Sequence, residues 1–190
     1  MLQDLIRLIG ENLDLIQLRH FAVFLIITLY AFVMLLFGVT RFRCPIQLSL
    51  GRVFVILGKA VLVALVEEIL FRCFIYYIVF RGWIGLDAGH AMIFTGLLFA
   101  WGHFRWIGVH MQAPYKPELF FGLFLFNMIL CRNFPVGNFL FHMFAILGVE
   151  VTNAIFEREA DRYWWIWDES HALIRSPIIW TILIAYYYIV

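Results

Sequence analysis

The strongest constraint on the fold of this chain is a series of apolar segments that approach or exceed the thickness of a lipid bilayer. A transmembrane helix needs about 20 mostly apolar residues. Four segments meet or approach that length: residues 21–39, 53–80, 91–109 and 136–154. Two shorter apolar segments follow this pattern at residues 119–131 and 177–190. The sequence therefore predicts an all-α, polytopic transmembrane helical bundle with five to six spanning helices.

Composition supports the same class. Hydrophobic residues make up 64% of the chain and charged residues 14%, whereas soluble domains are about half apolar and a quarter charged. The net charge of +1 provides no basic surface for nucleic acid, so we expect the lipid bilayer and not a nucleic acid as partner. No linker or repeat divides the chain, and residues 1–190 are predicted to form a single integral-membrane domain.

The N-terminal segment does not have the pattern of a cleavable signal peptide. Residues 1–20 place leucine and isoleucine near helical spacing but include Asp4, Glu11 and Asp14. An amphipathic segment of this kind favours a helix that lies in the membrane interface. A tryptophan-rich stretch at residues 164–167 predicts a second interfacial region.

Orientation is inferred from the basic residues of the loops. With six spans, the loops at residues 40–52, 110–117 and 155–176 share one side and hold most of the loop arginines and lysines. The positive-inside rule then places that side in the cytoplasm. We expect the plasma membrane if the protein is prokaryotic, as its small size suggests, and the endoplasmic reticulum if it is eukaryotic.

Five ionisable side chains inside the predicted spans are candidates for a polar site. They are Glu67, Glu68 and Arg72 in the stretch VEEILFRCF, together with His103 and His142. A charged residue at the centre of the bilayer costs about 2.5–3.5 kcal/mol and usually faces a functional interior. Glu67 lies about 21 Å along a helix from either end of its segment, which is the middle of the membrane.

Spacing separates the roles of the two glutamates. Glu68 and Arg72 are four residues apart, so they lie on one helix face and can form an ion pair. Glu67 is rotated by about 100° from Glu68 and has no basic residue at the third or fourth following position. It needs a partner from another helix, and His103 and His142 are the candidates. Alternatively, the Glu68–Arg72 pair only fixes helix register, and His142 is only a packing residue.

Several kinds of protease chemistry find no support in the residues. The serines and the central and C-terminal aspartates lie in predicted loops or at span edges: Ser49, Ser170, Ser176, Asp87, Asp161 and Asp168. The zincin motif HExxH is absent. A glutamate and histidines that activate water remain, and a carboxylate without a local partner suits a general base.

These residues resemble the motifs of a known family. Val66–Arg72, VEEILFR, matches an EExxxR motif, and Phe99 to His103, FAWGH, matches an FxxxH motif on the following helix. Both belong to the CPBP family of intramembrane proteases (CAAX proteases and bacteriocin-processing enzymes), which includes the type II CAAX prenyl endopeptidases. The resemblance covers residues 53–150, which it identifies as a CPBP-like catalytic core.

The resemblance implies a role for each site residue. Glu67 and His103 would activate the hydrolytic water, and His142 would stabilise the oxyanion of the tetrahedral intermediate. Glu68 and Arg72 would support the site. Relatives are treated as glutamate proteases, so no metal and no other cofactor is expected.

One position departs from the family pattern. The third family motif reads HxxxN or HxxxD, but Ile146 stands four residues after His142. The missing donor to the oxyanion is worth about 2.7–4 kcal/mol where such donors have been measured. Asn138, one helical turn before His142, is a candidate substitute, and Asn127 on the preceding segment is another.

The sequence thus predicts an intramembrane endopeptidase that cuts near the C-terminus of a membrane-presented substrate. The partner would be the C-terminal tail of a protein or peptide, with or without a lipid. An alternative is a non-catalytic membrane scaffold or assembly protein with a degenerate fold, similar to the gamma-secretase subunit Aph-1. A proton-coupled carrier that uses Glu67 and His103 is a third class, disfavoured by the small number of spans.

Overall fold

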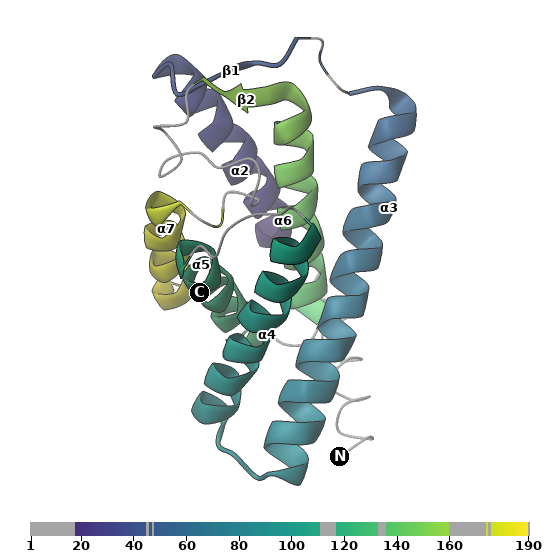
Figure 1. Ribbon diagram of the computed structural model, residues 1–190, viewed down its shortest axis with the longest axis vertical. Coiled ribbons are helices and arrows are strands. Elements are labelled where there is room, and N and C mark those ends of the chain that lie inside the picture. Colours follow the sequence, from purple (N-terminus) through teal and green to yellow (C-terminus); the bar gives the residue numbers. More distant parts are fainter. Residues whose placement is uncertain are drawn as a thin grey trace.

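The computed structural model describes residues 18–44, 46, 48–110, 117–132, 136–159, 174 and 176–189. These residues form helices, one π-helical segment and two short strands (Figure 1). In chain order they are α2 (Leu18–Leu36), β1 (Thr40–Phe42), α3 (Leu50–Glu67), η1 (Glu68–Trp83), α4 (Ala88–His110), α5 (Pro117–Arg132), α6 (Val136–Ile155), β2 (Phe156–Arg158) and α7 (Pro177–Ile189). The predicted N-terminal interfacial helix and the tryptophan-rich stretch at 164–167 lie outside the described residues.

Each predicted apolar segment forms a helix, and the start of several helices has a local cause. Ser49 precedes α3 and its hydroxyl accepts a hydrogen bond from the backbone N–H of Arg52 at 3.2 Å. Asp87 does the same for α4, accepting from the N–H groups of Gly89 and His90. Pro177 is the first residue of α7, where its missing N–H costs nothing. The prediction of an all-α chain is confirmed in its main elements.

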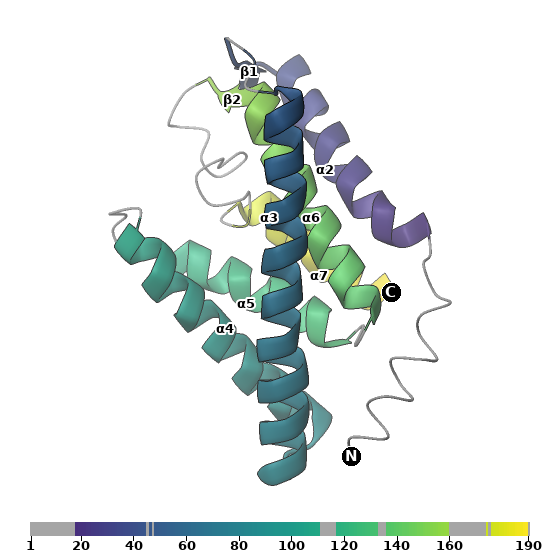
Figure 2. The ribbon, with the colours of Figure 1, turned by 90° about the vertical axis from the view of Figure 1, so that its right-hand side faces the viewer.

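The helix that contains both glutamates changes its backbone between them. α3 ends at Glu67 and continues without a break into η1, which begins at Glu68, and the two form one long rod (Figures 1 and 2). The end of η1 shows the π pattern, because the N–H of Ile84 donates to the carbonyl of Val79 five residues earlier. Such segments are rare and occur often at functional sites. Nothing in the apolar pattern predicted it.

The other helices pack around the rod, with α3 antiparallel to α6 and α2 parallel to α6 (Figures 1 and 2). α4 returns beside η1 after a turn in which Gly85 has a positive φ of 78°, and α6 packs against both α2 and α3. α5 lies between α4 and α7. The main core lies where η1, α4, α5 and α6 meet, and it includes Phe71, Phe99, Leu130 and Phe141.

A short antiparallel ribbon joins two connections that are distant in the sequence. β1 pairs with β2, with Arg41 opposite Glu157, and the Arg41 Nε donates to a Glu157 carboxylate oxygen at 2.8 Å. Glu157 and Glu159 raise the pKa of Arg41. The ribbon was not predicted. It places residues 40–42 and 156–158 at one end of the molecule, which agrees with the expectation that the loops 40–52 and 155–176 lie on the same side of the membrane.

One described helical window is long and apolar enough to cross a membrane by length and composition, and it is Asn138–Ile155 in α6. The apolar parts of α2 and α7 are shorter, and α3 carries Arg52, Lys59 and Glu67. The count of five to six spans is therefore not confirmed. The rod nevertheless exposes large apolar side chains over much of its length, including Leu62 and Ile69 at 61% and 55%.

Candidate active site

The three catalytic candidates and their two charged neighbours come together in the interior. Glu67 ends α3, Glu68 begins η1, and Arg72 follows one turn later on η1. His103 reaches the cluster from α4 and His142 from α6. The site thus depends on three segments that are far apart in the sequence.

Glu67 and His103 form the first contact of the cluster. Oε1 of Glu67 lies 3.0 Å from Nε2 of His103. The other ring nitrogen, Nδ1, lies 2.8 Å from the carbonyl oxygen of Phe99 and must carry a proton to donate to it. A hydrogen bond between Nε2 of His103 and the carboxylate of Glu67 also requires a proton. That proton is therefore shared between these two groups.

His142 bridges the two glutamates. Its Nδ1 lies 2.9 Å from Oε1 of Glu68, and its Nε2 lies 3.5 Å from Oε2 of Glu67. The carboxylate of Glu67 is consequently held between two histidines from two other helices. This arrangement agrees with the expectation that Glu67 finds its partners outside its own helix.

Glu68 and Arg72 form the ion pair that their spacing predicts. Nη1 of Arg72 lies 3.5 Å from Oε1 of Glu68, and the arginine side chain is fully buried. The guanidinium carbon also lies 4.6 Å from the ring centroid of Phe99, a cation–π contact. Phe99 in turn packs against His103 with ring centroids 4.1 Å apart. The ring of Phe99 therefore contacts two members of the cluster, Arg72 and His103.

Exposure divides the cluster into an accessible and a sealed part. The side chains of Glu67 and His103 are 17% and 20% exposed, whereas those of Glu68, Arg72 and His142 are between 0% and 7% exposed. Water can therefore reach the cluster at Glu67 and His103. The other three side chains lie behind them.

The two asparagines considered for the missing donor are both buried. The side-chain amide of Asn138 donates to the backbone carbonyl of Leu130, one of the last four carbonyls of α5, which lack partners within the helix. That contact ties the start of α6 to the end of α5. The amide of Asn127 donates to the sulfur of Cys131 at 3.4 Å.

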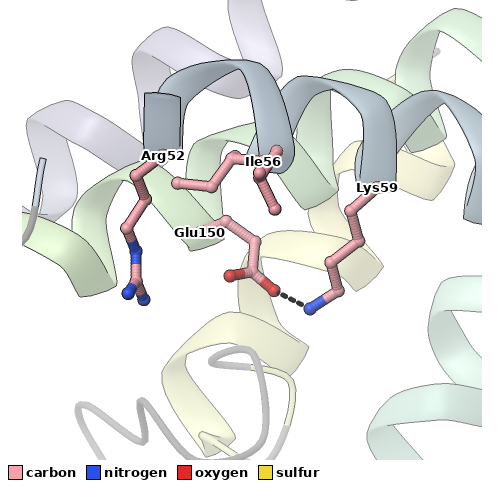
Figure 3. Close-up of a pocket in the computed structure, with 5 residues that line it drawn as sticks. Arg52, Ile56, Lys59 and Glu150 are labelled. Carbon is pink, nitrogen blue, oxygen red and sulfur yellow. Dashed lines mark hydrogen bonds and ion pairs between the residues drawn. The ribbon is translucent and has the colours of Figure 1, made fainter. Parts of the chain in front are cut away.

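A second polar pair, which was not predicted from the sequence, joins α3 and α6, the helices that carry Glu67 and His142. Lys59 of α3 and Glu150 of α6 form an ion pair beside a hollow that Arg52 and Ile56 also line (Figure 3). Lys59 lies within the apolar segment 53–80. A count of every ionisable residue in the predicted spans, lysines included, could have found it.

The donor groups of the described residues do not form a metal centre. In the part of the chain that the structure describes, no three His, Cys, Asp or Glu side chains are arranged to hold a metal ion. Independence from metal and other cofactors stays a prediction.

Comparison with known proteins places the chain in a family. A family model described as type II CAAX prenyl endopeptidase Rce1-like matches residues 49–189. No curated protein and no solved structure matches the chain. The matched range contains Glu67, Glu68, Arg72, His103 and His142. The chain belongs to the Rce1-like family of type II CAAX prenyl endopeptidases.

Proposed function

We propose that this protein is an intramembrane endopeptidase that cuts near the C-terminus of a prenylated or otherwise membrane-presented tail, using water activated by Glu67 and His103. Membership of a family of integral-membrane peptidases supports the reaction class. The observation that carries the proposal is the position of Glu67, which is partly exposed and held between His103 at 3.0 Å and His142 at 3.5 Å.

Charge balance explains why such a cluster can exist away from bulk water. Two carboxylates and one guanidinium have a net formal charge of −1. A single additional proton on His103 or His142 brings the sum to zero, and buried charges are tolerated when they are paired and hydrogen-bonded. The cluster therefore favours one proton that moves among Glu67, His103 and His142.

That mobile proton suits amide hydrolysis. Water bound at the exposed edge of Glu67 would lose a proton to the carboxylate as its oxygen attacks the scissile carbonyl carbon. At that moment the mobile proton would lie on Nε2 of His142, whose Nδ1 donates to Glu68, and would be donated in a hydrogen bond to the oxyanion. The proton taken from water would meanwhile occupy the Glu67–His103 contact. The intermediate would then collapse as the C–N bond breaks, and the proton on Glu67 or His103 would pass to the leaving nitrogen.

Glu68 and Arg72 would act as positioning residues. Glu68 accepts a hydrogen bond from Nδ1 of His142 at 2.9 Å. This leaves Nε2 of His142 facing the carboxylate of Glu67, where the water would be activated. Arg72 offsets the charge of Glu68. We assign Asn138 a supporting role, because its contact with Leu130 holds the helix that carries His142.

The test is proteolysis in proteoliposomes with prenylated and unprenylated C-terminal tails. Glu67→Gln and His103→Ala should each lower kcat/KM by about 10²–10⁴-fold, the usual contribution of a general base. Glu157→Gln, the same change on the β1–β2 ribbon, should leave it unchanged. Ile146→Asn should raise the rate if the oxyanion site lacks a donor. Full activity of Glu67→Gln would contradict the assignment of Glu67 as the general base. Inactivity of the wild type and of all variants on every tail would contradict the proposal and favour a scaffold.

A further inference from the structure

The hollow beside the Lys59–Glu150 pair lies on the same helix seam as the candidate active site. Positions 59 and 67 on α3 and positions 150 and 142 on α6 are eight residues apart on each helix. The contacts pair Glu67 with His142 and Lys59 with Glu150, so the helices run antiparallel in one register. Eight residues correspond to about 12 Å along the axis.

The hollow carries more positive than negative charge. It has a volume of 420 Å³ and is lined by Arg52, Val55, Ile56, Lys59 and Glu150. Glu150 is paired with Lys59 (Figure 3), whereas Arg52 has no ion pair with any side chain that the structure describes. Arg52 and Lys59 are seven residues apart, about two turns, and therefore lie on one face of α3. The apolar lining supplies a surface for an aliphatic side chain.

We propose that Lys59, with Arg52 beyond it on the same helix face, binds the C-terminal carboxylate of the substrate. This inference rests on the proposed function. A cut beside the prenylated cysteine of a CAAX tail leaves three residues before the carboxylate. Three extended residues span about 10 Å, which is close to the separation between Glu67 and Lys59 along the seam. Arg52 lies fifteen residues from Glu67, about 22 Å along the axis, so it would reach the carboxylate from the far side of Lys59. An arginine fork binds a carboxylate with two parallel hydrogen bonds.

The arrangement makes Glu150 a competitor for the same cations. Its carboxylate occupies Lys59 in the free protein, as the substrate carboxylate would in the complex. Removing the negative charge of Glu150 therefore leaves both cations for the substrate. If Lys59 and Glu150 formed only a structural ion pair, removing the charge of Glu150 would not improve binding of the substrate carboxylate.

The experiment compares CAAX tails that end in a free carboxylate with the same tails ending in an amide. The ratio of their kcat/KM values is the readout. Wild type should prefer the carboxylate by roughly 10- to 100-fold, because hydrogen bonds to charged groups contribute that much. Lys59→Gln should lower the preference by about tenfold, Arg52→Gln should lower it by a smaller factor, and Glu150→Gln should raise it. Arg81→Gln, an exposed arginine at the far end of η1, is the matched control and should leave the preference unchanged.

Each outcome separates this inference from the proposed function. Equal cleavage of both tails by wild type overturns the carboxylate site and leaves the peptidase intact. An equal loss on both tails in Lys59→Gln also overturns it, and points to an anionic lipid headgroup at the hollow if the loss depends on anionic lipid. Cleavage of neither tail by wild type overturns the proposed function and this inference together.

Discussion

Replacing Arg72 by methionine is expected to destabilise the protein by about 3–5 kcal/mol, because it leaves Glu68 as a buried carboxylate without its cation. The structure sets the scale. Nη1 of Arg72 and Oε1 of Glu68 are 3.5 Å apart, and two unit charges at that distance interact by about 5 kcal/mol at an effective dielectric of 20. The hydrogen bond from His142 to Glu68 remains in the variant and offsets part of this loss.

A double-mutant cycle isolates the pair. Glu68→Gln alone leaves the guanidinium of Arg72 with aromatic rings but without its anion, so we expect a loss similar to that of Arg72→Met. The double variant should be less destabilised than the sum of the two by about 2 kcal/mol, since residues in direct contact couple by amounts of this order. The free energy of unfolding would be measured by titration with SDS in mixed micelles, followed by circular dichroism.

Arg81→Met is the matched control, because it makes the same change at an exposed position of the same helix. It should alter the free energy of unfolding by less than about 0.5 kcal/mol. A loss below about 1 kcal/mol for Arg72→Met, or strict additivity in the double variant, would refute the argument that a buried charge pair holds this part of the site.

Three further substitutions test other parts of the fold. Gly122→Ala should destabilise by about 1–3 kcal/mol in the same titration, because its Cβ would lie 1.8 Å from the carbonyl oxygen of Ile174; no loss would show that the backbone at Ile174 shifts without cost. Asn138→Leu should lower stability by about 1–3 kcal/mol through an unsatisfied carbonyl at the end of α5, while a change confined to kcat would instead indicate a donor to the oxyanion. Asp87→Ala should reduce stability at neutral pH by removing the cap of α4. The hydrogen bond with His90 lowers the pKa of Asp87, so the wild-type advantage is complete above the ordinary aspartate range and is lost as pH falls through the lowered pKa; an advantage that persists in strong acid would contradict this assignment.

The order of helices follows from the sequence because it depends on local properties. Apolar length, Ser49 and Pro177 mark where helices lie and begin, and each signal acts within a few residues of the chain. The spacing of Glu68 and Arg72 likewise predicts their pairing, since both belong to one helix. The same spacing indicates that Glu67 needs a partner from elsewhere.

Other features depend on contacts between distant segments, and only the tertiary structure decides them. The bridge from His142 to both glutamates requires the antiparallel register of α3 and α6, which no local signal encodes. The direction of the Asn138 amide depends on the end of α5, since an unpaired carbonyl there competes for the donor. The hollow lined by Arg52 and Lys59 arises in the same way. The sequence by itself determined the helices and the titratable groups, whereas the packing of the helices determined which of those groups face one another.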